Sequence, residues 1–473
     1  MKNFFRFAES RNAGQFSKNA ERGVATLLAT VIILFGSLAI IGGFLVTALS
    51  EVKTVRDRVE SEKVFAAAEG GLEDAVFRLA TGKQTTFPAT MTVSGVTVTV
   101  SATDSGNTRT LTASGTDGKR TRKVSRLLTR DVAAVAFNYA VHIGEGGVQM
   151  QNNSKIVGNL FSNGSIVGEN NATVQGDALA AGTSRIEGMI VEANAKAHLV
   201  KTSVVNLDAF SNTTIESSTI NRDARASHLK TSIIMRDGYY LTKESSALIL
   251  GQQFPGTPPP ADVAAVPLPI AESQLDTWEA DAAAGGTKTC SGGKYIASNG
   301  EKIGPAKIPC DLEVSGTTVL TISGPVWVLG DILLANSAQV KLDPSFGSGS
   351  SVVIADDPAN RAVKSRIRVQ NTALVTGSGT AGSYLMMVSR NNSAKTGGDV
   401  NAIEIDNNTD TSIFYTNEGL VRIGNNLKMR ELTAWKLQMQ NSANVTYETG
   451  LAQVTFSGGP GGSWKVGAWQ EVP

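Results

Sequence analysis

The chain has 473 residues and a formal net charge of +1, and only 18% of its residues are charged. Average domains are about a quarter charged, and a near-neutral chain lacks the basic excess that nucleic-acid binding requires, so nucleic acid is excluded as a partner. The length allows two or three domains. Low charge and 48 glycines are typical of an exported, β-rich chain with many turns.

The first element in the chain is an uncharged run from Val24 to Ser50 behind a short basic leader. About 20 apolar residues span a bilayer, so the run is long enough to cross one. The leader is rich in Lys and Arg, which predicts that it stays in the cytoplasm and that everything after Ser50 is exported. A secretory signal peptide is disfavoured, because its apolar core is shorter and a small-residue cleavage site follows it.

An amphipathic helix continues directly from the apolar run. Apolar residues recur mostly three or four positions apart from Val52 to Leu79, which is the helical period. Thr81-Gly82 is a helix stop signal. From Val24 to Leu79 the helix would be about 80 Å long at 1.5 Å per residue.

The leader, the Gly before the apolar run and the amphipathic continuation together resemble the type IV pilin superfamily. The match is carried by Glu21-Arg22-Gly23-Val24-Ala25-Thr26-Leu27-Leu28 and by Phe65-Ala66-Ala67-Ala68-Glu69-Gly70-Gly71-Leu72-Glu73. The second stretch resembles the AAEAGLE segment of the PilX-like minor pilins. The resemblance covers roughly residues 15 to 80. Leu28 departs from the Glu that major pilins carry at the fifth mature position, which argues against a major subunit.

The resemblance implies that a prepilin peptidase cuts between Gly23 and Val24. In that family the new N-terminus is methylated, and the helix packs into a fibre. The implied partners are the prepilin peptidase, the membrane, other pilin subunits and the pilus assembly machinery. The implied location is the inner or cytoplasmic membrane, with the N-terminus inside and the C-terminal domains extracellular or in a pilus. A plain single-pass anchor remains the alternative.

After the long helix the period changes to that of strands. Four alternating runs follow, separated by the turn signals Ser94-Gly95, Ser105-Gly106-Asn107 and Asp117-Gly118. They predict an antiparallel meander with one face on the C-terminal half of the helix. The basic residues of its last run, Arg120, Arg122, Lys123, Arg126 and Arg130, are interpreted as a solvated face, with subunit or polymer contact as the alternative.

From about Tyr139 short apolar pairs recur between Asn-, Gly- and Ser-rich corners. Val148 and Ile166 are 18 residues apart, as are Ile156 and Val174. Regular short strands without helices between them predict stacked coils, that is, a parallel β-helix or solenoid. An irregular β-sandwich is the alternative. Coil-like runs resume at Thr318 and continue to Phe456.

A proline-rich segment, Phe254 to Pro260, interrupts the coils and is followed by a predicted short helix, Ile270 to Ala284. Cys290 and Cys310 lie beyond that helix on the exported side, where an oxidising compartment favours a disulfide over two free thiols. We interpret the insert as a flap or cap on one solenoid. Trp464 and Trp469 near the C-terminus are expected to form a capping strand over the last coil, or else an exposed aromatic ligand site.

Catalytic and metal-binding patterns are weak. Asn408-Thr409-Asp410 resembles a fragment of the pectin-hydrolase signature without its partner elements, and Asp356-Asp357 precedes a proline and predicts a turn. His142, His198 and His228 are isolated. Asp406, Asn408 and Asp410 have the spacing that opens a calcium loop, but Thr411 replaces the expected Gly. We therefore expect no enzyme, no cofactor and no metal site, and an Asn/Asp-rich corner at Asp406.

The expected fold is mainly β: a long transmembrane and amphipathic helix, a small antiparallel sheet, and a large parallel β-helix with a helical, disulfide-bonded insert. The predicted division is leader 1–23, helix 24–82, meander 83–135, first solenoid part 136–250, insert 251–315, and second solenoid part with its cap 316–473. The leading function is a minor pilin or pilin-like surface protein for adhesion or pilus assembly, with surface glycans or a host surface as possible targets. The alternatives are an anchored β-helix protein outside any pilus and an anchored polysaccharide-active enzyme.

Overall fold

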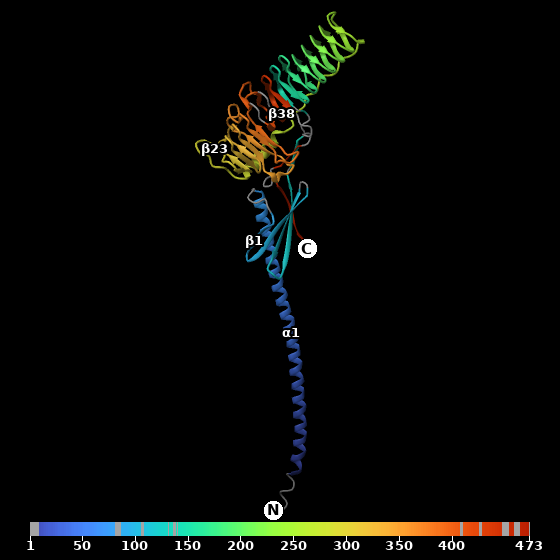
Figure 1. The fold of residues 1–473 in the computed structure, drawn as a ribbon. Helices are drawn as coiled ribbons and strands as arrows, with labels where there is room; N and C mark the ends of the chain where they lie inside the picture. Colours follow the sequence, from blue (N-terminus) through green and yellow to red (C-terminus); the bar gives the residue numbers. More distant parts are fainter. Residues whose placement is uncertain are drawn as a thin grey trace, which may run out of the picture.

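The computed structural model describes residues 9–80, 87–105, 108–130, 132–135, 139, 141–406, 410–424, 428–446, 454–457 and 464–472, with helix side chains described from residue 26 onward. A long helix, a small sheet and a solenoid follow one another in space (Figure 1). The predicted fold class is confirmed in each of these parts.

Helix α1 spans Glu9–Ala80, so it begins inside the predicted leader and ends just before Thr81-Gly82. Between Leu27 and Val59 its large apolar side chains are exposed. The Thr26–Leu79 part is long and apolar enough to cross a membrane. One stripe of the last turns is buried instead, at the helical spacing of a packed face: Val64, Ala67, Ala68, Leu72, Ala75, Val76 and Leu79.

That stripe packs on an antiparallel sheet formed by β1 (Ala89–Val93), β2 (Val96–Ser105), β3 (Thr108–Thr116), β4 (Thr121–Arg130) and β41 (Trp464–Val472). The four-stranded meander is confirmed, and Ser94 and Gly95 both have positive φ in its first turn. We call helix residues 64–80 and these five strands the head.

The fifth strand of the head corrects a prediction. The segment at Trp464 and Trp469 does not cap the last coil, because β41 pairs antiparallel with β4. The ring of Trp469 meets Phe65 of helix α1 edge-on, 5.7 Å between centroids. The chain therefore returns to the head after building the solenoid, and its C-terminus lies beside the meander (Figure 1).

Small residues let the helix and the sheet approach closely. A Cβ added to Gly71 would lie 2.6 Å from a methyl of Val98, and one added to Gly115 would lie 2.8 Å from the Val64 carbonyl oxygen. The Ala- and Gly-rich stretch of the helix thus faces the sheet at contact distance.

The basic run of β4 is not a wholly solvated face. Arg120 and Arg126 form ion pairs with Asp57 and Glu73 of helix α1. Arg120, just before β4, and Arg126, on β4, thus join the end of the meander to the helix.

A two-stranded stem connects the head to the solenoid. Strand β5 (Val132–Val135) leaves the head and pairs antiparallel with β40 (Val454–Ser457), which returns to it. We refer to these two strands as the stem. The solenoid is thus an insertion between β4 and β41, not a domain appended after the head.

The first half of the solenoid coils outward from the stem. Its strands stack in parallel, coil on coil: β6 (Val141–Met150), β7 (Lys155–Val157), β8 (Leu160–Ser162), β9 (Ile166–Gly168), β10 (Thr173–Val174), β11 (Ala178–Ala180), β12 (Arg185–Glu187), β13 (Ile190–Val191), β14 (Ala195–Lys201), β15 (Val204–Val205), β16 (Ala209–Glu216), β17 (Thr219–Ile220), β18 (Ala224–Lys230), β19 (Ile233–Ile234), β20 (Gly238–Lys243), β21 (Leu248–Ile249) and β22 (Gln253–Pro255).

The predicted repeat is confirmed in the first coils, where Val148 pairs with Ile166 and Ile156 with Val174. Farther out the coils shorten, so that Ile186, Val200, Ile215 and Leu229 stack on one another 14 or 15 residues apart. All four are fully buried.

Asn and Asp side chains occupy one corner of successive coils and accept a hydrogen bond from a backbone N–H of the next coil. The run continues through Asn159, Asp177, Asn194, Asp208, Asp223 and Asp237. These bonds satisfy donors at the bend between strands, which explains the polar corners of the sequence.

The second half coils back toward the stem and completes the stack. Its strands are β23 (Lys294–Ile296), β24 (Lys302–Ile303), β25 (Ala306–Ile308), β26 (Asp311–Val314), β27 (Val319–Ile322), β28 (Val326–Val328), β29 (Ile332–Leu334), β30 (Gln339–Leu342), β31 (Ser351–Ala355), β32 (Ile367–Val369), β33 (Leu374–Thr376), β34 (Leu385–Ser389), β35 (Asn401–Ile405), β36 (Asp410–Tyr415), β37 (Leu420–Ile423), β38 (Lys428–Met439) and β39 (Asn444–Thr446), with a 3-10 turn η1 (Pro344–Phe346). Coils therefore begin at Lys294, inside the predicted insert, and not near residue 316.

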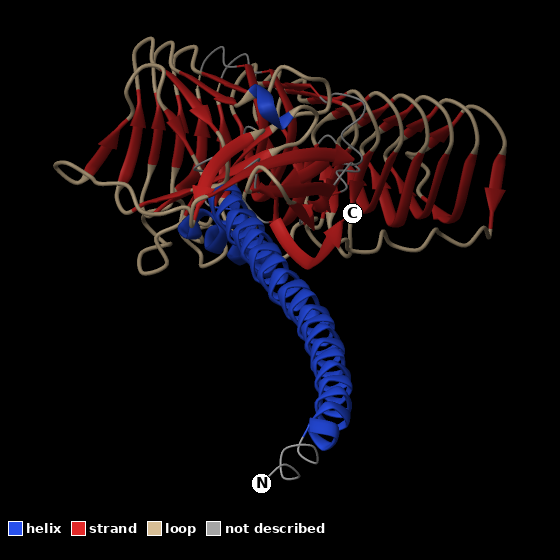
Figure 2. Cartoon of the chain, turned by 90° about the horizontal axis from the view of Figure 1, so that it is seen from below, coloured by secondary structure: helices blue, strands red, loops and turns tan. Residues whose placement is uncertain are grey.

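The two halves join in the middle of the stack. Strand β38 pairs in parallel with β6, and β39 pairs in parallel with β7. One hydrophobic core runs through both halves. The solenoid extends to both sides of helix α1 (Figure 2).

The segment between the halves runs along the flank of the stack. Residues 257–266 pass back over the first half, with contacts from Arg225 at Pro258 to Asn163 at Val266. Helix α2 (Glu272–Ala284) then packs on the second half, with Leu275, Trp278 and Ala282 buried as predicted. Cys290 and Cys310 are bonded to each other, and Cys290 and Tyr295 pack against the core at the β23 end.

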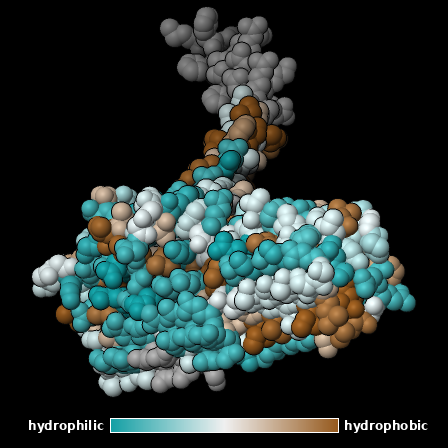
Figure 3. Space-filling view, turned by 90° about the horizontal axis from the view of Figure 1, so that it is seen from above, coloured by the Kyte–Doolittle hydropathy of each residue, from teal (hydrophilic) through white to brown (hydrophobic). Residues whose placement is uncertain are grey.

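The opposite end is more apolar on its surface. Exposed aliphatic side chains gather on the last coils of the first half: Ile233, Met235, Leu241, Leu248 and Leu250. Figure 3 shows hydrophobic side chains collected toward the right-hand end of the solenoid. The two ends of the stack thus present different surfaces.

Candidate functional site

A cleft of about 460 Å³ opens where the two halves of the solenoid meet. Its lining is Gln149, Asp399, Asn401, Leu420, Arg422, Lys436, Gln438 and Gln440. Gln149 comes from β6 of the first half, and the other residues come from β35, β37, β38 and their adjoining turns in the second. The cleft, which we call the junction cleft, is therefore assembled only when β38 stacks on β6.

The strand register places these side chains in two neighbouring rows. Arg422, Gln438 and Gln149 are paired across β37, β38 and β6, and form one row. Asn401, Leu420 and Lys436 form the other. Alternate residues of a strand point to the same face, so the side chains of both rows lie on the outer face of the solenoid.

Arg422 is fixed in place at the edge of the cleft. Its guanidinium donates to Glu404 at 3.0 Å. With the Gln440 amide oriented to satisfy both groups, Gln440 accepts from Arg422 Nε at 2.8 Å. A guanidinium held from two sides keeps one geometry, which makes the cleft wall rigid.

The charges in the junction cleft are few and of both signs. Lys436 is exposed, and within the described part of the chain it has no carboxylate within 4 Å. Asp399 supplies the single carboxylate of the lining. Glycoside hydrolases use a pair of carboxylates on either side of the bond they cut, and this lining contains one carboxylate together with four carboxamides.

Beyond the cleft, the row that contains Gln149 continues with charged side chains that form ion pairs between adjacent coils. Glu187 lies 3.9 Å from Lys201, and Lys230 lies 3.2 Å from Glu216. Each cation in this stretch faces an anion on the adjacent coil. Gln438 and Gln149 replace such a pair in the cleft, which leaves their amide groups available to a ligand.

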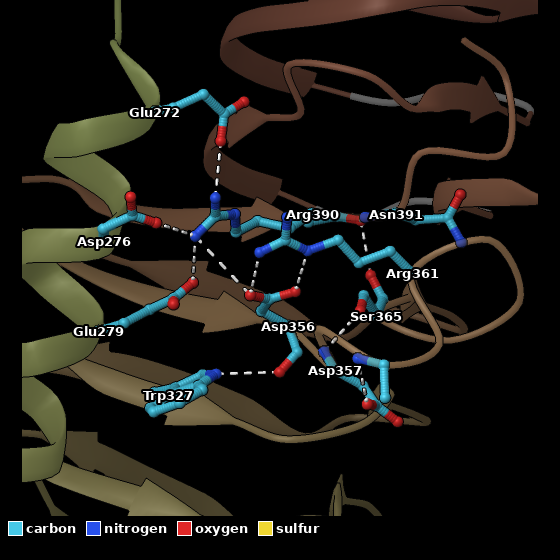
Figure 4. A network of polar contacts seen from close by, with 12 residues as sticks. Glu272, Asp276, Glu279, Trp327, Asp356, Asp357, Arg361, Ser365, Arg390 and Asn391 are labelled. Carbon is cyan, nitrogen blue, oxygen red and sulfur yellow. Dashed lines mark hydrogen bonds and ion pairs between the residues drawn. The ribbon is translucent and has the colours of Figure 1, made fainter. Parts of the chain in front are cut away.

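A second polar group, buried beneath helix α2, has a structural role. Figure 4 shows the Arg390 guanidinium at the centre of four carboxylates. Arg390 is 5% exposed and donates to Asp276 at 2.6 Å, Glu279 at 3.0 Å and Glu272 at 2.6 Å, while Asp356 lies 3.7 Å away. Three of these acids belong to α2, so the cluster fixes the helix to the solenoid.

The cluster changes the acidity of one of its members. Burial raises the pKa of Glu279 to about 7, and the neighbouring Asp356 carboxylate adds to this effect, while Arg390 opposes it. Asp356 is itself fully buried and bonded to Arg361 at 2.7 Å. The predicted Asp356-Asp357 turn is confirmed, since both residues lie between the end of β31 and the turn at 358–359. Asp357 accepts a hydrogen bond from the Asn360 amide, whereas the side chain of Asp356 belongs to the buried cluster.

The predicted lone histidines lie along the first half. His142 faces the carbonyl oxygen of Val266 at 3.3 Å, and burial lowers its pKa. His198 faces Asp262 at 3.1 Å. Both hold residues 257–266 against the coils, whereas His228 bonds Thr242 of the next coil at 2.7 Å. The structure therefore gives each histidine its own structural contact, and only β16 lies between the strands that carry His198 and His228.

The remaining predicted site residues fall wholly or partly outside the described side chains. Gly23 and Val24 lie within helix α1, in the part whose side chains are not described. Of the calcium-like triplet, Asn408 lies outside the described residues, and burial raises the pKa of Asp406, with Glu404 adding to the effect. Among the described residues no group of three His, Cys, Asp or Glu is placed to hold a metal ion.

The residues of the junction cleft were not singled out in the sequence. Gln438-Met439-Gln440 and Leu420-Val421-Arg422 alternate as strands do, but they resemble many other strands of the chain. Their meeting with Gln149 depends on a contact between segments almost 300 residues apart, for which the sequence carries no local signal.

Together these elements define a class of protein: an anchor-like apolar helix, a small head of one helix on an antiparallel sheet, and a parallel β-solenoid inserted into that sheet. No protein-family model matches the chain, and no curated protein matches it. Among solved structures it is similar to the competence-associated pilin ComZ from Thermus thermophilus, with 11% identity over 87% of this chain and 97% of that one, and a TM-score of 0.24. A likeness this distant carries no argument about function.

Proposed function

We propose that this chain is a minor pilin or pilin-like surface protein, which is anchored and assembled through helix α1 and displays its solenoid for adhesion or pilus assembly. The observation that carries the proposal is the head. The last strand of its sheet, β41, follows the solenoid in the chain and pairs with β4. The helix and the sheet share a hydrophobic core of their own, to which the solenoid contributes no residue.

The two ends of helix α1 support a division of roles. The exposed apolar part suits a bilayer or the packed core of a fibre, and the buried stripe suits the head. The solenoid then lies beyond the head, away from the apolar part of helix α1 (Figure 1). A surface held in that position is accessible to other cells, to polymers or to further subunits.

The proposal includes an orientation and a set of partners. The basic leader would remain in the cytoplasm, and the head and solenoid would be exported. The PilX-like resemblance of residues 65–73 adds a prepilin peptidase and other pilin subunits as partners. We also propose a role in binding without catalysis, which is supported by the single carboxylate of the junction cleft.

The experiment that tests the proposal is mass spectrometry of the N-terminus of the surface-exposed protein. The expected mature chain begins at Val24 and is N-methylated, and Gly23→Leu should leave the leader in place because a bulky side chain prevents close approach of the peptidase. Gly14→Leu, also in the leader, is the matched control and should be processed normally. An intact leader on wild-type protein at the cell surface would favour an anchored β-helix protein outside any pilus.

A further inference from the structure

The geometry points to the junction cleft as a binding site for an uncharged, linear oligosaccharide. This inference rests on the proposed display function, because it names the ligand class that the displayed solenoid would hold. The cleft lies on the outer face of the coils, and its volume of about 460 Å³ falls in the usual range of ligand sites.

The chemistry of the lining matches hydroxyl groups. Four of the eight lining side chains are carboxamides: Gln149, Asn401, Gln438 and Gln440. A carboxamide presents a donor and an acceptor side by side, and a hydroxyl group also donates and accepts. The Gln440 oxygen already accepts from Arg422, so Gln149, Asn401 and Gln438 are the amides that offer both groups to a ligand. Leu420 lies between them but is only 6% exposed, so the contacts to a ligand would come from the polar side chains. Amides recur at neighbouring positions, as a polyhydroxylated ligand requires.

The charges favour an uncharged ligand. Lys436 and Asp399 have opposite sign, and the charge of Arg422 is matched by Glu404 at 3.0 Å. An acidic saccharide would gain from Lys436 but would meet Asp399, so the cleft has no net attraction for it. A neutral sugar can use both groups as hydrogen-bond partners.

The arrangement of rows favours a chain over a single sugar. Both rows run along the solenoid axis, with a new side chain at each strand, and adjacent strands are about 4.8 Å apart. A linear oligosaccharide lying along this axis would meet Arg422, Gln438 and Gln149 in succession. The strands are held by the core, so the side chains are positioned before the ligand arrives.

The test uses the full-length chain in detergent, applied to a printed array of neutral and acidic oligosaccharides. The oligosaccharide with the strongest signal is then titrated by calorimetry. We expect a neutral linear oligosaccharide to bind, and Gln149→Ala and Gln438→Ala each to weaken binding about tenfold, which corresponds to about 1.4 kcal/mol. Gln339→Ala is the matched control: Gln339 is an exposed strand amide on β30, away from the cleft, and its removal should leave the affinity unchanged.

Several outcomes overturn the inference. One is an array without signal, another is a strong preference for acidic sugars, and a third is an affinity that neither cleft variant changes while circular dichroism shows both to be folded. Attachment to cells stripped of surface glycans, with a blank array, would assign the cleft to a protein partner and reject the sugar. If the array is blank while the mature N-terminus is Val24, only the ligand assignment fails. If sugar binds while the leader is intact, the pilin proposal fails instead.

Discussion

The docking of helix α2 on the solenoid should weaken as the pH rises. While α2 is docked, burial raises the pKa of Glu279 to about 7, whereas a detached helix would expose this carboxyl at its ordinary value of 4.5. A pKa that is higher in the docked state gives docking stability that is fully present below 4.5 and is lost as the pH rises through about 7. The loss across this window is roughly 3 kcal/mol, or on the order of a hundredfold in the opening equilibrium.

The variant that tests this reasoning is Glu279→Gln, which keeps the size of the side chain and an oxygen that can accept from Arg390. Hydrogen exchange of the amides in 272–284, corrected for the intrinsic effect of pH, measures the opening of α2. The wild type should lose protection between pH 5 and 8, and Glu279→Gln should not. Glu272→Gln is the control, because Glu272 also bonds Arg390 but has a half-exposed side chain. It should shift protection at every pH without removing the slope.

Equal pH slopes in the wild type and in Glu279→Gln would refute the reasoning, since the slope would then come from other groups. The facing groups are Arg390, Arg361 and Asp356 on the solenoid and Glu272 and Asp276 on the helix. A rise in protection with pH would refute it as well, because burial of Glu279 can only produce a loss.

Three further outcomes are expected. Ile215→Ala should destabilise the coils around it by about 2–5 kcal/mol through the cavity it leaves, seen as lost amide protection in the flanking coils, whereas Val204→Ala, at an exposed position, should have little effect. Thiol labelling of the unfolded, unreduced protein should give almost no signal, because Cys290 and Cys310 are bonded; two labelled thiols would contradict this. Deleting residues 464–473 should expose the β4 edge and the face that Trp469 covers, so trypsin should cut the head of the truncated chain faster than that of the full chain.

Much of the fold follows from periodicity in the sequence. The spacing of Val148 and Ile166 gives the pitch of the first coils, because residues that stack in a solenoid must recur once a turn. Helix α2 was likewise predictable, since Leu275, Trp278 and Ala282 lie on one helical face. Local patterns of this kind report which side of an element is buried.

The features that could not be predicted depend on contacts between distant segments. The sequence pattern places Trp464 and Trp469 on the nearest coil, yet β41 pairs with β4, more than 300 residues upstream. The ion-pair cluster of Arg390 has no sequence pattern that predicts it, because its four carboxylates come from two separate segments. An alternating pattern predicts that a strand exists, whereas its pairing partner depends on contacts between segments that are distant in the sequence.

The stem determines how the molecule would respond to a mechanical pull. A solenoid attached by its last coil could be peeled from that end, one repeat at a time, since each repeat contacts only its neighbours. Here both ends of the solenoid enter the stem at the middle of the stack, where β6 and β38 are paired with each other and are covered by coils on either side. Tension between helix α1 and a bound surface would be shared by the two paired strands of the stem. Since no terminal coil lies at the point of attachment, we expect the solenoid to unfold under force as a unit and not by losing one coil after another.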